Sequence, residues 1–177
     1  MKKFMKDQTG FTLVEMIIVI IIMGILAAVI IPQIGTTSAD AKVSAVKQDL
    51  ATMRNAVEVY YSQHNNAYPG AWKNDGTGAV ATALEAETAF VDQLTKYSDI
   101  KGACQGTKDA THIYGPYLKG GKLPMNSFND SNAVVCDIAT ADITVRDWDT
   151  VGTAGWHFYV LTGVLVANDT SAHATGL

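Results

Sequence analysis

The chain has 177 residues, of which 48% are hydrophobic and 17% are charged, and its formal net charge at pH 7 is −4. Three lysines lie within the first ten residues, so the rest of the chain is more acidic than the whole. An acidic chain with no basic stripe argues against a nucleic-acid partner. The length accommodates one modest globular domain in addition to an apolar segment near the N-terminus.

Residues 11–34 form an apolar segment with a single charged side chain, Glu15. A helix of this length reaches ~36 Å, which is enough to cross a hydrocarbon core of ~30 Å. The preceding residues 1–10 carry three lysines and one aspartate, which predicts that this end stays in the cytoplasm. We therefore expect a transmembrane helix at 11–34, with the remainder of the chain outside the cytoplasm.

The junction between the basic leader and the apolar segment has the form of a processing site. In an ordinary secretory signal the small residue at the cleavage site follows the apolar run, whereas here Gly10 precedes it. Cleavage after Gly10 would remove the leader, residues 1–10, and leave a new amine on Phe11. Gly10, Phe11, a hydroxyl residue, two aliphatic residues and Glu15 resemble the signal of type IV prepilins and type II secretion pseudopilins. The resemblance covers residues 1 to about 35.

This resemblance implies cleavage between Gly10 and Phe11 by a prepilin peptidase, N-methylation of Phe11, and polymerisation of the mature chains into a thin helical filament. The implied partners are identical subunits, the peptidase, an assembly platform in the inner membrane, and the membrane itself through the N-terminal helix. Such a subunit lies in the inner membrane before assembly. It then joins an extracellular pilus, or a periplasmic filament if it is a pseudopilin.

Glu15 needs an explanation because a carboxylate at the middle of a bilayer costs up to ~3 kcal/mol. It lies four residues after Phe11, about one helical turn from the amine that cleavage would create. The resemblance implies that Glu15 neutralises this amine on a neighbouring subunit and so drives filament assembly; the alternative is a side chain that snorkels to the membrane surface. Gly24 and Ala28 form a small-xxx-small pair suited to helix packing, and Pro32 predicts a kink or local melting.

The helical period continues past the apolar segment, through residues 35–64. Apolar residues recur there at spacings of three and four: Val43, Val46, Leu50, Met53, Val57 and Tyr60. We expect one long helix at about 11–64, whose amphipathic second half packs on a globular head formed by residues 65–177. Turn-forming residues at 65–70 end this helix. A second helix is expected at 79–97, followed by a loop at 98–132.

β-branched and aromatic residues in the last third predict a sheet within 133–167 and a fraying tail after it. The expected strands are 133–138, 143–148, 155–161 and 164–167. Thr162 and Gly163 predict a two-residue hairpin between the last two strands. The economical arrangement is a small antiparallel sheet laid on the amphipathic half of the long helix. The expected fold class is α+β, and it resembles the type IV pilin fold.

The two cysteines, Cys104 and Cys136, suggest one disulfide if the head lies outside the cytoplasm, and two reduced, buried thiols are the alternative. Asp130, Asp147 and Asp149 lie in an Asn- and Asp-rich region with oxygen ligands of the type that calcium uses. The resemblance to major pseudopilins implies a calcium site near the sheet, although this chain lacks their usual loop pattern. Such clusters more often form turns, so we expect no cofactor other than this calcium candidate.

The sequence contains no metalloprotease, nucleophile-elbow or phosphate-loop motif, so we expect no enzyme. The favoured function is that of a structural subunit of a type IV pilus, in keeping with the cysteine pair in the C-terminal half. A pseudopilin of a type II secretion system is the alternative, since residues 114–118 (YGPYL) resemble the segment before the sheet in major pseudopilins. A membrane-anchored binding module that never polymerises is the third possibility.

Overall fold

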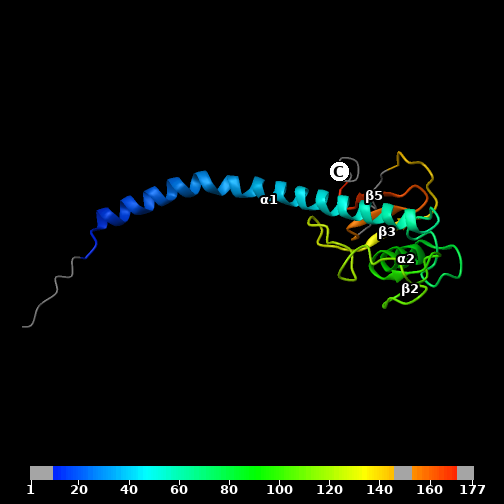
Figure 1. The fold of residues 1–177 in the computed structure, drawn as a ribbon. Helices are drawn as coiled ribbons and strands as arrows, with labels where there is room; N and C mark the ends of the chain where they lie inside the picture. The colour runs from blue at the N-terminus through cyan, green and yellow to red at the C-terminus, as the bar shows by residue number, and fades with distance from the viewer. Residues whose placement is uncertain (1–9, 146–152, 171–177) are drawn as a thin grey trace, which may run out of the picture. The chain divides into compact units, whose positions relative to one another are not determined.

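The computed structural model describes residues 10–145 and 153–170, without the side chains of residues 29 and 31–37. The chain divides into two compact units between Ala41 and Lys42. The first unit contains the N-terminal part of a long helix, α1, and the second contains the rest of α1 together with the head (Figure 1).

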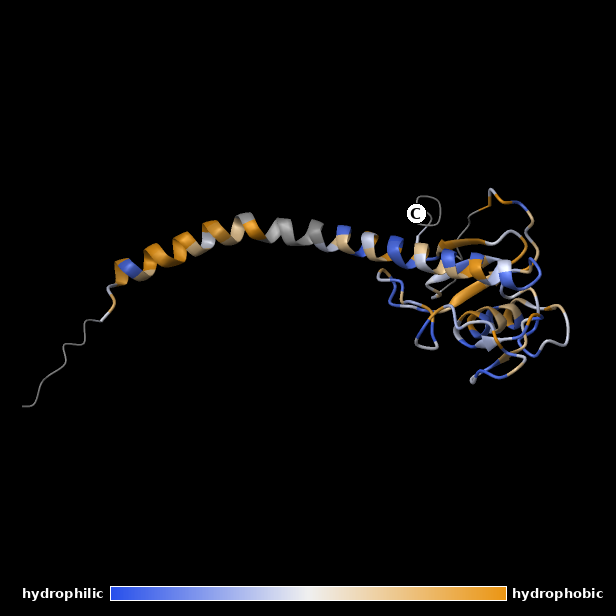
Figure 2. Cartoon of the chain, in the orientation of Figure 1, coloured by the Kyte–Doolittle hydropathy of each residue, from blue (hydrophilic) through white to orange (hydrophobic). Residues whose placement is uncertain are grey.

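Helix α1 runs from Leu13 to Gln63, which confirms the predicted long helix to within two residues at either end. From Leu13 to Ile30 the described residues of α1 are apolar except for Glu15, and Figure 2 colours most of this stretch as hydrophobic. The backbone remains helical through Pro32, so the predicted local melting does not occur. A proline removes only one backbone hydrogen bond from a helix, and the bonds of the adjacent turns can hold the helix together.

In the second unit, α1 forms one wall of the hydrophobic core. Its buried apolar residues follow the predicted spacing of three and four: Val46, Leu50, Met53, Val57 and Tyr60. Arg54 lies beside this seam and donates from Nε and Nη2 to the Leu165 carbonyl, at 3.1 and 2.8 Å. This pair of hydrogen bonds ties α1 to the sheet, 111 residues further along the chain.

Helix α2 runs from Ala83 to Thr95 and is therefore shorter than the predicted 79–97. Thr82 is the N-cap residue of α2, and its hydroxyl accepts a hydrogen bond from the Glu85 amide at 3.2 Å. The Glu85 carboxylate accepts in turn from the Ala81 amide at 2.8 Å, so the two side chains cap the first turn together. The buried Phe90 of α2 packs on Phe158 with ring centroids 4.5 Å apart.

Within the described residues, five short strands form two sheets. Strands β1 (Tyr97–Ser98) and β2 (Cys104–Gln105) pair antiparallel within the stretch that the sequence predicted as helix end and loop. Strands β3 (Val134–Asp137), β4 (Trp156–Tyr159) and β5 (Val164–Ala167) form a second sheet in that order. The described chain is therefore α+β, with a long N-terminal helix and a small C-terminal sheet as predicted.

The larger sheet is mixed, so the prediction of a purely antiparallel sheet is wrong for one of its strands. Strand β3 pairs parallel with β4, whereas β4 and β5 pair antiparallel. The predicted strand at 143–148 does not form over its described part, since the Asp142 carboxylate accepts from the amide and hydroxyl of Thr144 at 2.8 and 2.7 Å and closes a turn there. Residues 146–148 lie outside the described residues. A parallel pair requires a long connection between its two strands, and residues 138–155 connect β3 to β4.

The connection between β4 and β5 is longer than the predicted two residues. Strand β4 ends at Tyr159, and a turn covers residues 160–163. The Gly163 amide donates to the Tyr159 carbonyl at 2.8 Å, and Gly163 has the positive φ of 72° that the sequence analysis expected of it. A Cβ on Gly163 would also collide with the ring of Tyr68, so both the positive φ and the close contact require glycine at this position.

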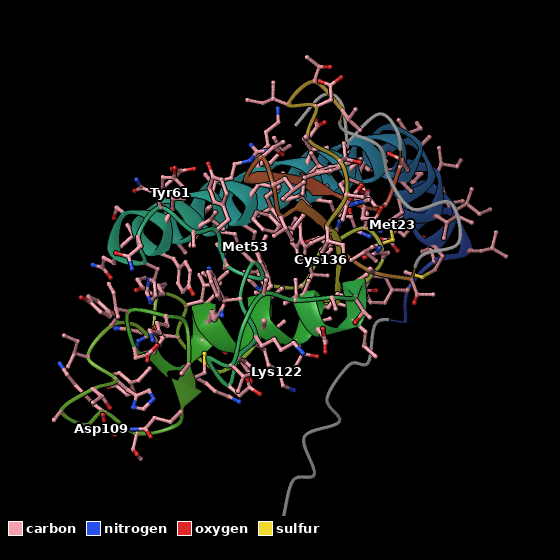
Figure 3. All side chains as sticks on the ribbon, turned by 90° about the vertical axis from the view of Figure 1, so that its right-hand side faces the viewer. Met23, Met53, Tyr61, Asp109, Lys122 and Cys136 are labelled. Carbon is pink, nitrogen blue, oxygen red and sulfur yellow. The ribbon has the colours of Figure 1, made fainter. Side chains whose placement is uncertain are left out.

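The core of the head lies between α1, α2 and the three-stranded sheet. Figure 3 shows Met53 of α1 and Cys136 of β3 within the side chains that fill this space, and both belong to one buried cluster. Trp156 and Phe158 of β4 and Leu165 of β5 complete the cluster from the sheet. The predicted tail, residues 171–177, lies outside the described residues.

Candidate functional site

The predicted cleavage site lies directly ahead of α1, in backbone that is neither helix nor strand. Gly10 is exposed, and Phe11 is 81% exposed. A Cβ on Gly10 would meet no described atom within 4 Å, so the fold of the described chain does not itself require glycine there. The Gly10–Phe11 bond is therefore open to an enzyme that selects the small residue. Residues 1–9 of the leader lie outside the described residues.

Thr12 and Glu15 form a closed hydrogen-bonded pair at the start of α1. The amide and the hydroxyl of Thr12 both donate to Glu15 Oε2 at 2.8 Å. The Glu15 amide donates back to the Thr12 hydroxyl oxygen at 3.2 Å. This is the capping box, in which an N-cap hydroxyl and a carboxylate three residues later satisfy amides that the first helical turn leaves unpaired.

The capping box gives Glu15 a role inside its own chain that the sequence analysis missed. The signal was present, because Thr-x-x-Glu ahead of an apolar run is the pattern of this motif. The second carboxylate oxygen, Oε1, makes no hydrogen bond within the described residues. Glu15 can therefore cap its own helix through Oε2 while Oε1 keeps its capacity to accept a hydrogen bond.

The surface of α1 around Glu15 is apolar and uncovered in the single chain. Large hydrophobic side chains from Phe11 to Ile30 are between 43% and 81% exposed. A patch of this extent marks a surface that is covered by another molecule or by lipid. Gly24 and Ala28 lie on this stretch and are exposed, and a Cβ on Gly24 would meet nothing within 4 Å in the described chain. Another helix can therefore approach closely there.

Within the described residues no helix combines the length and the hydropathy that a membrane span needs. The transmembrane segment predicted at 11–34 includes position 29 and positions 31–34, including Pro32, whose side chains lie outside the described residues.

The predicted disulfide between Cys104 and Cys136 is wrong, because both cysteines are free. Cys104 belongs to β2 of the small sheet, and its thiol donates to the Gly102 carbonyl at 3.3 Å. Cys136 belongs to β3 of the other sheet and is buried in the core. Burial raises the pKa of the Cys104 thiol to about 12 and raises the pKa of Cys136 as well, so both stay protonated and unreactive at neutral pH.

The Asn- and Asp-rich region forms turns in its described part. Asn126 is buried; its amide group donates to the Gly155 carbonyl at 3.0 Å, and its side-chain oxygen accepts from the Phe128 amide at 2.9 Å. Asp130 lies in the same turn with a φ of 52°. Asp147 and Asp149, the other calcium candidates, lie outside the described residues. Among the residues that the structure describes, no three His, Cys, Asp or Glu side chains gather as a metal site.

Comparisons with known proteins point to the same N-terminal segment. Residues 5–31 match the family described as "Prokaryotic N-terminal methylation motif". This range contains Gly10, Phe11, Thr12 and Glu15. No solved structure matches the chain significantly.

Several curated proteins are similar over longer stretches. The type IV major pilin protein PilE of Neisseria gonorrhoeae is 39% identical over 153 residues, which cover 79% of this chain and 86% of that protein. The fimbrial protein of Neisseria meningitidis serogroup B is 35% identical over 67% of this chain and 65% of its own length. The type II secretion system core protein G of Pseudomonas aeruginosa is 41% identical over 64 residues, 36% of this chain and 44% of that protein. The chain thus spans less than two thirds of the length of these last two relatives.

Proposed function

The chain belongs to the type IV pilin family, and on this basis we propose that it is a structural subunit of a type IV pilus. In this proposal a prepilin peptidase cleaves after Gly10 and methylates the new amine of Phe11. The mature subunit then polymerises through the apolar half of α1 into a helical filament. Its role is mechanical rather than catalytic.

The arrangement at the start of α1 is the observation that carries this proposal. It combines an exposed bond at Gly10–Phe11, a carboxylate held in the first helical turn, and an apolar helix surface that the single chain leaves uncovered. Bundling identical helices would cover that surface. Contacts that join different patches of successive subunits build an open helical assembly when the rotation between subunits does not close a ring.

Glu15 supplies the electrostatic part of assembly. In a bundle of apolar helices, the Phe11 amine and the Glu15 carboxylate would be the two charges of each subunit in the core. An unpaired charge in a dry core costs several kcal/mol, so pairing the two favours the assembled state. Oε1, which is not used in the capping box, can accept from the amine of a neighbouring subunit while Oε2 keeps the helix capped.

The lengths of the sequence matches favour a subunit of a pilus over a subunit of a secretion pseudopilus. The 153-residue match to a major pilin is much longer than α1 and must include a large part of the head. The 64-residue match to core protein G is only about as long as the leader and α1 together. Because core protein G is nevertheless 41% identical there, a pseudopilin of type II secretion is the second candidate.

The proposed location follows from the order of these steps. Before assembly, the apolar half of α1 lies in the inner membrane, where lipid covers its side chains, and the head lies outside the cytoplasm. An assembly platform in that membrane then adds subunits to the growing filament. The final location is an extracellular pilus, or the periplasm in the pseudopilin alternative.

Replacing Glu15 tests the proposal, because two variants separate the charge from the cap. Glu15→Gln keeps a capping-box side chain but removes the charge, whereas Glu15→Ala removes both. Glu58→Gln, an exposed carboxylate of α1 in the head, is the matched control. We expect sheared surface filaments from wild type and from Glu58→Gln, and at least tenfold less from both Glu15 variants at equal amounts of cleaved subunit.

The preparation of sheared surface filaments also distinguishes a pilin from a pseudopilin. A subunit that dominates the sheared surface fraction is a pilin, and one that appears in filaments only inside the periplasm is a pseudopilin. Wild-type yields of filament from Glu15→Gln would show that the charge has no role in assembly. A processed wild-type subunit that is never found in any filament would overturn the structural function itself.

A further inference from the structure

A hollow of about 450 Å³ lies on the head, and none of the residues of the processing site belongs to it. Its walls come from three segments that are separate in sequence: the turn after α1, the loop at 72–78, and Ile100 with Lys101. Small-ligand sites in proteins range over ~300–1,000 Å³. The hollow is therefore large enough for a ligand of one or two rings.

Buried hydrogen bonds hold the walls in place. Gln93 of α2 is completely buried; its side-chain oxygen accepts from the Gly70 amide at 2.8 Å, and its nitrogen donates to the carbonyls of Trp72 and Gly102 at 2.9 and 3.1 Å. The loops on two sides of the hollow are thus fastened to one helix.

His64 holds the third wall of the hollow in place. Its ring stacks on Tyr60 with centroids 3.7 Å apart, and its Nε2 lies 3.0 Å from Ser98 Oγ of β1. The end of α1 is thereby held against the segment that leads to Ile100 and Lys101. Walls held in this way are pre-formed, and a ligand would not have to order them on binding.

The lining combines apolar surface with unused hydrogen-bond donors. Trp72 and Ile100 are 43% and 39% exposed. The indole N–H of Trp72, the side-chain amide of Asn65 and the ammonium group of Lys101 have no partner within the described residues. These three groups can all donate, and one of them carries a positive charge.

The acidic groups next to the hollow already have partners. The Asp75 carboxylate accepts from the amide and the hydroxyl of Thr77 at 2.9 and 2.7 Å. The Asp99 carboxylate accepts from the amides of Lys101 and Ala103 at 2.8 and 2.9 Å. These neutral donors orient the two carboxylates. Lys101 is the cation among the residues that line the hollow, and its ammonium group forms no ion pair within the described residues.

We propose that this hollow binds a carboxylated sugar unit of an acidic polysaccharide. The apolar face of a sugar ring covers Trp72 and Ile100, its hydroxyl groups accept from Trp72 and Asn65, and its carboxylate pairs with Lys101. A neutral sugar would leave the ammonium group without a counterion. Inorganic phosphate could pair with Lys101 but would leave the apolar surface uncovered. The inference goes beyond filament formation and holds equally for a pilus and for a secretion filament.

Ligand-observed relaxation NMR on the full-length protein in detergent tests this proposal. The probes are glucuronate, glucose and inorganic phosphate, each with detergent alone as the blank. Wild type is expected to bind glucuronate with a dissociation constant of about 1 mM or lower, and to bind glucose at least about tenfold more weakly. Lys101→Gln should remove the preference for glucuronate, and Trp72→Leu should remove binding of both sugars.

Lys122→Gln, an exposed lysine that does not line the hollow, is the matched control and should bind as wild type does. Far-UV circular dichroism verifies that each variant is folded. Equal binding of glucuronate and glucose by wild type would overturn the proposal. So would an unchanged preference in Lys101→Gln, or phosphate that displaces glucuronate at equal concentration, which would identify a simple anion site.

Discussion

The hydroxyl of Thr12 donates to the Glu15 carboxylate at 2.8 Å, and the Glu15 amide donates back to the same hydroxyl oxygen at 3.2 Å. The pair sets the first residue of α1 at Leu13, two residues beyond the bond that we expect to be cut. The bond that we expect to be cut consequently lies in exposed chain that is neither helix nor strand, where a peptidase can bind it.

Replacing Thr12 should loosen the start of α1. Thr12→Val keeps the shape but removes the hydroxyl, and loss of an N-cap hydroxyl costs about 1 kcal/mol, or a factor of roughly five in the local opening equilibrium. We expect correspondingly faster hydrogen exchange at the amides of the first turn, measured by mass spectrometry on the protein in detergent. Thr12→Ser, which restores the hydroxyl, should exchange as wild type does. Equal exchange in Thr12→Val would show that the capping box does not stabilise the helix.

The stability of the head should fall as the pH drops below the ordinary histidine pKa of 6.5. Burial lowers the pKa of His64, despite its hydrogen bond to the Tyr60 carbonyl and the nearby Asp99. In this window the unfolded chain takes up a proton that the folded head does not, so protonation favours unfolding. The stability that neutral His64 contributes is present above pH 6.5 and is lost as the pH falls.

Urea unfolding at pH 7.5 and at pH 5.5 measures this effect. His64→Gln should reduce the difference in unfolding free energy between the two pH values. A wild-type head that is equally stable at both pH values would contradict the burial of a neutral His64.

Gly155→Ala should destabilise the head, because a Cβ there would collide with the Ser131 carbonyl oxygen and crowd Asn126. The backbone of the turn would have to move, which costs about 1–3 kcal/mol in overpacked sites. Gly106→Ala is the control, since a Cβ at Gly106 meets nothing within 4 Å in the described chain. Thermal unfolding of both variants checks the expectation. Equal melting temperatures would mean that the contact between Gly155 and the turn is not tight.

Both cysteine thiols should react with a labelling reagent once the chain unfolds. Labelling of denatured, unreduced protein is expected to give two modified thiols per chain. In the folded protein, modification at neutral pH should be slow, because burial raises the pKa of Cys104 to about 12. Chains that cannot be labelled after denaturation would show that the cysteines are bridged after all.

Much of the fold could be predicted from periodicity and turn chemistry. The spacing of Val46, Leu50, Met53 and Val57 gave the buried face of α1, because helix geometry alone places these residues together. The direction of β3 could not be predicted in this way. It depended on whether a strand begins at residue 143, and at residues 143–145 the local bonds of Asp142 to Thr144 outweighed the β propensity of Ile143 and Val145.

Only part of the candidate site could be predicted from the sequence, for a similar reason. Gly10, Phe11 and Glu15 lie within a stretch of six residues, so their sequence pattern identified them. The cysteine prediction failed because sequence alone does not show whether the fold brings two thiols within bonding distance, and in the structure both are free. The hollow beside Trp72 could not have been predicted either, since Gln93 assembles its walls from segments that are distant in sequence.

The N-terminus of the filament subunit tests the central claim most directly. Mass spectrometry of sheared surface filaments should find this chain beginning at N-methylated Phe11, with residues 1–10 absent. Replacing Gly10 by a bulky residue should leave the uncleaved precursor in the membrane and no filament. A filament subunit that still begins at Met1, or that begins beyond Ile34 without its apolar helix, would contradict the account.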